Sequence, residues 1–415
     1  MNHSPLLLQL VIILGTARLL GLVLRYFGQP AVIGEMAAGL LLGPVVFGAI
    51  APELHAEIFA PGSRGALEGL SQLGLVLFMF IVGAELRLPT GVRSQLVAST
   101  WIGVLSVILP LGLGFAIAYP LYPVVSIPGV PFLPFALFTA VAVSITAFPV
   151  MARILKDRNM TQTTVGRLGL TSAAVADVLA WVLLALVVVL ASSAQNWNLL
   201  VRQIVGVLLL CAVIFGVFRP LIAWLLSKYA SDGRPAGALL AALLVGTFAC
   251  AYATDYIGVH AVFGAFLFGA CVPRDDRLLH SLIERIEHVA VLVLMPVFFA
   301  LAGLNTTSNA FVGAGLGGLA LIMLVSIGGK FAGGIIGARV CRYSWRESFD
   351  VGSLMNARGL MELIVMKVGL DIGVIGQQMF TMLLVMALVT TVMTSPLLTL
   401  FTRNTSSAHE REVAR

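Results

Sequence analysis

Asp177 and Lys330 are opposite charges placed inside long apolar segments. Asp177 is the only charged residue between Leu168 and Asn196, and Lys330 lies nine residues before Arg339. An isolated charge at the centre of a bilayer costs on the order of 2.5 to 3.5 kcal/mol, so each group must be paired, neutralised or used. A carboxylate can hold either a proton or a hard monovalent cation, because each neutralises the same charge. Asp177 is therefore the first candidate for ion chemistry.

The two charges also lie at a similar predicted depth. With Arg167 and Arg339 as markers of the cytoplasmic interface, Asp177 is about 15 Å and Lys330 about 14 Å into the bilayer, at ~1.5 Å per helical residue. We expect their helices to face one another and the two side chains to form an ion pair. A purely structural pair remains the alternative.

Composition defines the elements that must hold these residues. Hydrophobic residues make up 59% of the 415 residues and charged residues 11%, which excludes a water-soluble globule. We predict an all-α polytopic membrane protein with about 13 transmembrane helices. The apolar segments start near Leu6, Pro30, Leu67, Gln95, Phe132, Thr164, Leu199, Gly237, Val259, Val289, Phe311, Glu347 and Gln377.

The distribution of Lys and Arg predicts the orientation. Basic residues gather around the odd-numbered connections, which places these in the cytoplasm, the N-terminus outside and the C-terminus inside. The residues on that side are Arg25, Arg87, Arg93, Lys156, Arg158, Arg167, Arg219, Lys228, Arg234, Arg274, Arg277, Arg285, Arg339, Arg342 and Arg346. Only Arg64, Arg202 and Lys367 fall around the other connections. The net charge of +6 is thus a topology signal, and no nucleic acid is expected as a partner.

An odd number of helices predicts two inverted six-helix repeats around a linking helix, which is typical of transporters. The transmembrane domain would cover residues 1–402, with a short cytoplasmic tail at 403–415. The first six helices would occupy about 6–195, the linking helix about 199–226 and the last six about 237–401.

One helix in each half is interrupted by polar residues or residues that break helices. The first carries Ser144, Thr146 and Pro149, and the second carries Asn356, Arg358 and Gly359. A broken helix at membrane depth is tolerated where its freed backbone groups line a cavity or bind something. A proline kink and a packed glycine would be the structural alternative.

The residues at these breaks form a second candidate set. Ser144 and Thr146 are candidate ion or proton ligands beside Asp177, whereas Pro149, Asn356, Arg358, Gly359 and Glu362 support the breaks. We expect Arg358 to compensate a helix dipole or to pair with Glu362. A polar cluster at mid-bilayer around two broken helices is typical of an ion site.

Four ordered motifs add a resemblance. These are Val32–Pro44 (VIGEMAAGLLLGP), Ser144–Pro149 continuing through Ala152–Leu155, His260–Leu267 (HAVFGAFL), and Asn356–Val365 (NARGLMELIV). Over about Leu6 to Thr402 the chain resembles the monovalent cation:proton antiporters. It is most similar to their second branch, with plant cation/proton exchangers and bacterial potassium efflux antiporters.

The resemblance implies the sodium/proton antiporter fold, a homodimer, and a secondary antiporter that exchanges K+ or Na+ for protons. It implies that Asp177 binds the proton and the cation by turns, that Lys330 pairs with this acidic site, and that Thr146 and nearby carbonyls help to coordinate the ion. Some relatives carry two adjacent acids where this chain has Ala176 before Asp177, so electroneutral exchange is expected.

Two other transport functions remain open: a potassium efflux channel-like system, and an organic anion transporter that shares the crossover fold. No G-x-G-x-x-G unit follows the last helix, so no cytosolic nucleotide-binding domain is expected in this chain. No enzymatic motif is evident. We expect no cofactor besides the transported ions, membrane lipid as a partner, and a location in the cell (inner or plasma) membrane.

Overall fold

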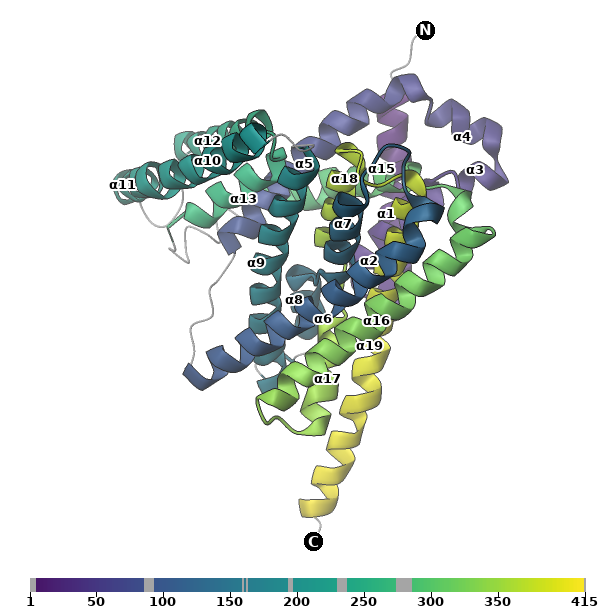
Figure 1. The fold of residues 1–415 in the computed structure, drawn as a ribbon, viewed down its shortest axis with the longest axis vertical. Helices are drawn as coiled ribbons and strands as arrows, with labels where there is room; N and C mark the ends of the chain where they lie inside the picture. The colour runs from purple at the N-terminus through teal and green to yellow at the C-terminus, as the bar shows by residue number, and fades with distance from the viewer. Residues whose placement is uncertain are drawn as a thin grey trace. The chain divides into compact units, whose positions relative to one another are not determined.

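The computed structural model describes residues 5–85, 93–158, 160–161, 163–192, 197–229, 237–273 and 286–413. In these ranges the regular structure is helical (Figure 1). Ten of the helices in the described ranges are long and apolar enough to cross a bilayer, and two shorter apolar helices span Phe132–Ser144 and Ala261–Cys271. Each predicted apolar segment contains a helix, which confirms the all-α polytopic class. Several basic residues that were used to predict orientation lie outside the described ranges, namely Arg87, Arg234, Arg274, Arg277 and Arg285.

The chain divides into two compact units, and each draws on both halves of the sequence. Unit 1 comprises residues 1–15, 50–87 and 185–301, and unit 2 comprises 16–49, 88–184 and 302–415. Unit 1 contains α4 (Pro52–Ile58), α5 (Arg64–Glu85), α10 (Trp197–Val213), α11 (Arg219–Tyr229), α12 (Gly237–Ile257) and α13 (Ala261–Cys271). Unit 2 contains α2 (Ala31–Leu42), α6 (Arg93–Val125), α7 (Phe132–Ser144), α8 (Phe148–Asp157), α16 (Ala314–Val340), α17 (Trp345–Met355), α18 (Leu360–Asp371) and α19 (Gln377–Val413).

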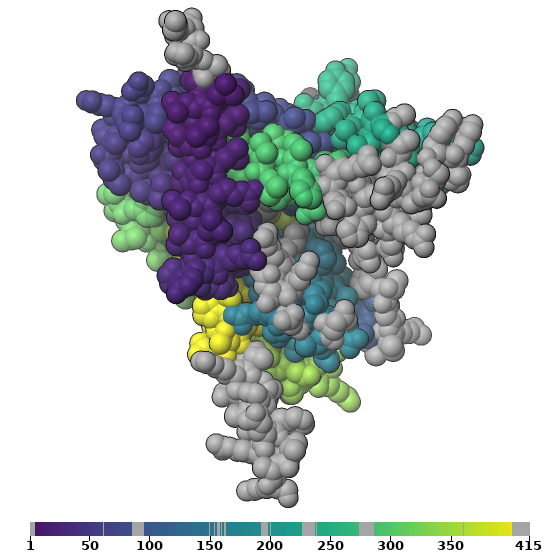
Figure 2. Space-filling view, turned by 180° about the vertical axis from the view of Figure 1, so that it is seen from behind, coloured from purple at the N-terminus to yellow at the C-terminus, as the bar shows by residue number. Residues whose placement is uncertain are grey.

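Among the described helices, four run from one unit into the other: α1 (Pro5–Tyr26), the short α3 (Phe47–Ile50), α9 (Thr164–Ser192) and α15 (Met295–Leu304). One side of α1 is exposed along its length, including Leu8, Val11 and Leu22 (Figure 2). Apolar side chains in this position suit contact with lipid.

The predicted linking helix contains a π-helical turn, Ile214–Phe218, between α10 and α11. Pro220 lies two residues after the end of this turn. Proline lacks the N–H that a regular helix would use, and a π turn is one way in which a helix accommodates that loss.

Unit 1 is built on apolar packing. Phe80, Phe268 and Leu243 belong to one buried cluster to which α5, α12 and α13 contribute. Gly83 and Gly269 allow α5 and α13 to approach closely, because a Cβ on either would come within 2.2 Å of a carbonyl oxygen of the other helix. The glycines therefore set the spacing of this helix pair.

In unit 2, α16 lies along α6 (Figure 1). A Cβ added at Gly333 would lie 2.9 Å from Ser106 Cα, and one at Gly337 would lie 2.7 Å from Ile102 Cα. Small residues at a helix interface let the backbones meet, which is the usual mode of helix association in membranes. This close contact holds the backbone of α16, and with it Lys330.

Helix α19 contains Pro396 and continues to Val413, so the predicted tail at 403–415 is helical over most of its length. Pro396 leaves the Val392 carbonyl without its intrahelical donor. The Gln29 side chain supplies one, with Nε2 3.2 Å from Val392 O. The Arg158 guanidinium donates to the Ser395 carbonyl at 2.7 Å, so α8 and the start of α2 both hold this part of α19.

Candidate functional site

Two interrupted helices form the centre of unit 2, and their breaks coincide with the predicted ones. Residues 145–147 are not helical between α7 and α8, and residues 356–359 are not helical between α17 and α18. Pro149 is the second residue of α8, a first-turn position where proline costs no intrahelical hydrogen bond. Gly359 has a φ of 157°, a conformation that glycine adopts readily because it has no Cβ.

The two breaks contact each other through the backbone. The Ala147 N–H donates to the Ala357 carbonyl at 3.1 Å. Residues 147 and 357 are remote in sequence, so this hydrogen bond joins the interruption of one helix directly to that of the other. Both residues are fully buried.

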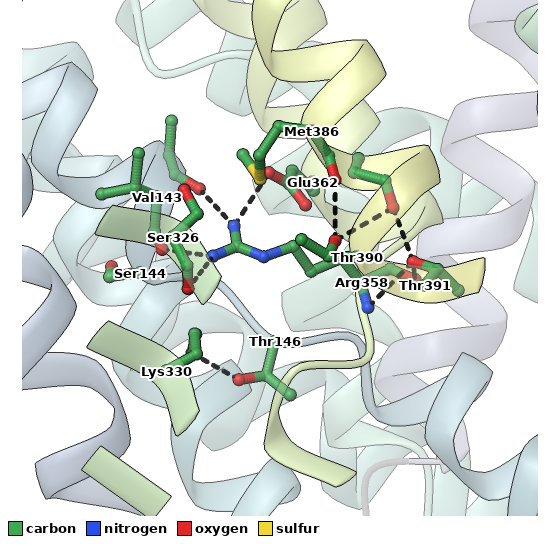
Figure 3. Close-up of polar contacts among 12 residues, drawn as sticks. Val143, Ser144, Thr146, Ser326, Lys330, Arg358, Glu362, Met386, Thr390 and Thr391 are labelled. Atoms are coloured by element: carbon green, nitrogen blue, oxygen red, sulfur yellow. Dashed lines mark hydrogen bonds and ion pairs between the residues drawn. The ribbon is translucent and has the colours of Figure 1, made fainter. Parts of the chain in front are cut away.

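Arg358 ties the second break to the end of α7 (Figure 3). Its guanidinium donates to the Val143 carbonyl at 2.6 Å and to the Ala142 carbonyl at 3.2 Å. These carbonyls belong to the last turn of α7, where intrahelical donors are missing and the helix dipole is negative. A third acceptor is the Ser326 carbonyl of α16, at 3.4 Å.

Glu362 completes this arrangement as the partner of Arg358. Nη1 of Arg358 lies 3.0 Å from Oε1 of Glu362, and both side chains are fully buried. Glu362 occupies the first turn of α18, where a negative charge complements the helix dipole. The pair therefore neutralises the facing ends of two half-helices, and both predicted roles of Arg358 are present.

Helix α19 holds the backbone of Arg358 in place. Thr391 Oγ1 lies 2.7 Å from the Arg358 carbonyl and equally close to the Ala387 carbonyl of its own helix, so its proton is shared between these two acceptors. The Arg358 N–H donates to the same hydroxyl at 3.2 Å, which satisfies an amide freed by the helix break (Figure 3).

Lys330 is fully buried on α16, and its ammonium group donates to Thr146 Oγ1 at 2.5 Å (Figure 3). This contact differs from the predicted one: no direct ion pair joins Lys330 to Asp177 in this structure. The two charges remain near enough to interact electrostatically. The Thr146 hydroxyl lies in the non-helical break, where it can reach α16. It accepts the hydrogen bond of the Lys330 ammonium group in place of the Asp177 carboxylate.

Asp177 lies on α9 with a side chain that is only 4% exposed. Its carboxylate lies against the backbone N–H of Phe148, the first residue of α8. Oδ1 is buried and finds no hydrogen-bond partner among the described residues. A buried carboxylate oxygen of this kind has its acceptor capacity available for a proton or a cation.

The remaining predicted residues fall around the same breaks. Ser144 ends α7 and donates to the Val141 carbonyl at 2.8 Å, which leaves its oxygen lone pairs available. Asn356 is the C-terminal cap of α17, and its fully buried amide has no partner for Oδ1 or Nδ2 within the part of the chain that the structure describes.

Two contributors were missed from sequence. Ser326 accepts from Arg358 through its carbonyl, and Thr391 holds the backbone of Arg358. The sequence offered no signal for the Ser326 carbonyl, because every residue carries one. It offered none for Thr391 either.

Broken helices that meet beside buried charges define a secondary transporter with discontinuous helices. The chain belongs to the sodium/hydrogen exchanger transmembrane family, which matches residues 11–401.

Named relatives and one solved structure agree with this family. The chain is 36% identical to the Na(+)/H(+) antiporter NhaS4 of Synechocystis over 96% of its own length and 98% of that protein. It is 36% identical to cation/H(+) antiporter 17 of Arabidopsis thaliana (94% of this chain, 48% of the relative) and 33% identical to K(+)/H(+) antiporter 1 of Saccharomyces cerevisiae (95% and 46%). It spans about half the length of these plant and yeast relatives.

The sodium proton antiporter MjNhaP1 of Methanocaldococcus jannaschii has a similar fold. The TM-score is 0.61 at 17% identity, and the match covers 95% of this chain and 96% of that one. The predicted sodium/proton antiporter fold is thereby confirmed.

Proposed function

We propose that this protein is a secondary active antiporter that exchanges a monovalent cation, K+ or Na+, for protons across the membrane. The observation that carries the proposal is the Asp177 carboxylate, which is buried on α9 beside the start of α8 with Oδ1 unpartnered among the described residues. The family and the names of the relatives support the same exchange.

Competition between a proton and a cation for one carboxylate couples cation transport to proton transport. A proton and a cation each neutralise Asp177, so binding of one displaces the other. Alternating access of the neutralised site to each side then produces exchange, because the charged, empty site is costly to move through the low-dielectric interior.

Thr146 provides a second hydrogen-bond acceptor for the Lys330 ammonium group, besides Asp177. When a cation occupies Asp177, the ammonium group must lie elsewhere, and the Thr146 hydroxyl accepts it 2.5 Å away. A buried ammonium group without any acceptor would lose several kcal/mol of solvation. Thr146 thereby lets Lys330 leave Asp177 without an unsatisfied charge.

The Arg358–Glu362 pair serves as support for the breaks. It neutralises helix ends that would otherwise present partial charges at membrane depth. The Arg358 guanidinium donates to three backbone carbonyls and to Glu362 Oε1, whereas Arg358 Nε and Glu362 Oε2 find no partner among the described residues. The Glu362 carboxylate is therefore held by a fixed positive charge, and Asp177, which has no such salt bridge within the described ranges, is the proposed exchangeable site.

The test is transport by the purified protein in sealed liposomes, with a pH-sensitive fluorophore inside and Na+, K+ or Li+ added outside. Wild-type protein should release protons on addition of at least one cation, and Asp177→Asn should abolish this exchange. Asp371→Asn is the matched control, because Asp371 is a partly exposed residue paired with Lys367 on α18. Full activity of the Asp177→Asn variant would refute the assignment.

Stoichiometry and orientation are part of the proposal. A single acid, with Ala176 before Asp177, favours electroneutral exchange. The rate should then be insensitive to a membrane potential imposed with valinomycin, and a strong dependence would contradict electroneutral exchange.

The protein is proposed to lie in a cell membrane with its N-terminus outside and its C-terminus in the cytoplasm, and two copies are proposed to form a homodimer. An impermeant maleimide should label a cysteine at Ser344 from the cytoplasmic side only.

A further inference from the structure

A pocket lies where the end of α16 meets the beginning of α6, away from the ion site. It has a volume of about 590 Å³. Val97, Ala98 and Trp101 line it from α6, and Val340, Arg342 and Tyr343 line it from the end of α16 and the turn that follows. All these residues belong to unit 2.

The position of the pocket along the helices places it at a membrane interface. The apolar span of α16 ends at Val340, and that of α6 begins at Gln95. The pocket therefore lies within the first two turns of one spanning helix and at the last residue of the other. Trp101 is 50% exposed and Trp345 is 60% exposed, and tryptophan is enriched at this level of a bilayer.

The lining is apolar on the side of the helices and basic at the turn. Val97, Ala98 and Val340 offer aliphatic contacts, whereas Arg342 brings an exposed guanidinium to the rim. Such a division matches a molecule with an acyl chain at one end and a negative group at the other. Arginine binds phosphate oxygens with two parallel hydrogen bonds.

The turn that carries Arg342 is held in place by its neighbours. The Arg339 guanidinium donates to the Tyr343 carbonyl and stacks on Trp345, with Cζ 4.6 Å from the ring centroid. Glu347 is engaged in a capping box with Ser344 and accepts from its N–H at 2.9 Å. The acidic side chain of this segment is therefore already bound.

Arg342 adopts a conformation that suits another residue better. Its φ is +66°, and the position directly after the C-terminal cap of a helix usually carries glycine. An arginine there is strained relative to glycine, because its Cβ crowds the backbone. Its presence is explained if the side chain has a use.

We propose that this pocket binds the head group of an anionic phospholipid. Arg342 would hold the phosphate, and Trp101 and Val340 would contact the glycerol and the first acyl carbons. Phospholipid head groups are present at the interface where both helices end. A negative head group complements the three arginines of residues 339–347, whose one glutamate is already engaged in the capping box.

The experiment measures lipid binding and does not depend on transport, so it can fail or succeed independently of the antiporter proposal. Delipidated protein in detergent is titrated with phosphatidylglycerol or phosphatidylcholine, and retained lipid is read by native mass spectrometry together with the thermal unfolding midpoint. We expect phosphatidylglycerol to bind and to raise the midpoint, with a smaller effect of phosphatidylcholine.

Variants at position 342 distinguish the effect of the side chain on lipid binding from the effect of the backbone conformation on stability. Arg342→Gly should relieve the strained φ and leave the lipid-free midpoint unchanged or higher, while affinity for phosphatidylglycerol falls about tenfold. Arg342→Lys should retain part of the affinity. Arg346→Ala is the matched control, because Arg346 is exposed on the same segment and does not line the pocket.

Three results would overturn the proposal. One is an unchanged phosphatidylglycerol affinity in Arg342→Gly, and another is equal binding of the two lipids. The third is an equal rise of the midpoint with inorganic phosphate alone, since that would indicate an anion site without lipid specificity. A Val340→Trp variant, which fills the apolar part of the pocket, should also weaken lipid binding while Arg342 stays in place.

Discussion

The two units of this protein bury different kinds of side chain. Among the described residues, the buried charged side chains all lie in unit 2: Glu35, Asp177, Lys330, Asp350, Arg358 and Glu362. The described core of unit 1 is apolar, with Phe80, Phe268 and Leu294 in one cluster. Unit 1 also buries uncharged polar side chains, such as Gln203 and Thr254, but no charged side chain among its described residues. Because charges are costly inside a membrane, their concentration in unit 2 supports the ion site proposed at Asp177.

Glycine has different uses in the two units. In unit 1, Gly83 and Gly269 bring α5 and α13 together face to face. In unit 2, Gly333 and Gly337 do the same for α16 and α6, but Gly359 serves backbone conformation at a helix break. The stability of unit 1 should therefore respond to changes in side-chain volume, whereas the stability of unit 2 should respond to changes in both side-chain volume and side-chain charge.

The largest expected effect is the loss of one member of the buried pair in unit 2. Arg358→Met leaves Glu362 as an unpaired buried acid and leaves the Val143 carbonyl without its donor, at a cost of about 3 to 5 kcal/mol. The thermal midpoint in detergent should fall sharply. Replacing both residues, with Arg358→Met and Glu362→Leu, should recover part of this loss. Equal midpoints for the single and the double variant would contradict the pairing.

A volume change in unit 1 comes next. Gly83→Val places a Cβ 2.2 Å from the Phe266 carbonyl oxygen, so α5 and α13 must move apart, at about 1 to 3 kcal/mol. The midpoint should fall, while the folded fraction keeps its cation affinity. Gly69→Val is the control on the same helix, because nothing lies within 4 Å of its Cβ. A loss of cation affinity in folded Gly83→Val protein would contradict the prediction that cation binding depends on unit 2 and not on the packing of unit 1.

Thr146→Val tests the alternative position of Lys330 in unit 2. Without the hydroxyl, the ammonium group turns to Asp177 and competes with the cation, so KM for the cation should rise about tenfold, the equivalent of one charged hydrogen bond. Thr146→Ser should restore the wild-type KM. In a Lys330→Gln background the valine should have little further effect, and an undiminished tenfold rise there would show that Thr146 acts independently of Lys330.

A change of pH by one unit should have an effect no larger than that of Thr146→Val. Protons and cations compete for Asp177, so a rise in pH removes the competitor and the apparent KM for the cation falls, by at most about tenfold per pH unit. The maximal rate at saturating cation should change little over the same range. Liposome assays at a series of equal inside and outside pH values measure both quantities. A KM independent of pH would mean that the two ions do not share one carboxylate.

Sequence alone selected the candidate residues because the bilayer penalises every exception to an apolar helix. Asp177 and Lys330 stand out as lone charges, and the segments 144–149 and 355–359 stand out as polar residues, proline or glycine in apolar runs. The helical segments and the family motifs were also recognised from the contrast between apolar runs and the polar, proline or glycine residues within them. The pairing of Arg358 with Glu362 was one of the two roles predicted for Arg358, because the two opposite charges lie only four positions apart within one apolar run.

The tertiary structure alone decided which partners these groups meet. Lys330 reaches Thr146 rather than Asp177, and Arg358 reaches carbonyls of residues 142 and 143, more than two hundred positions away. Backbone carbonyls are present at every residue, so no letter in the sequence marks the ones that lack a donor. Only the contact between the α7–α8 break and the α17–α18 break, which depends on the packing of whole helices, brings those acceptors within hydrogen-bond distance of one guanidinium.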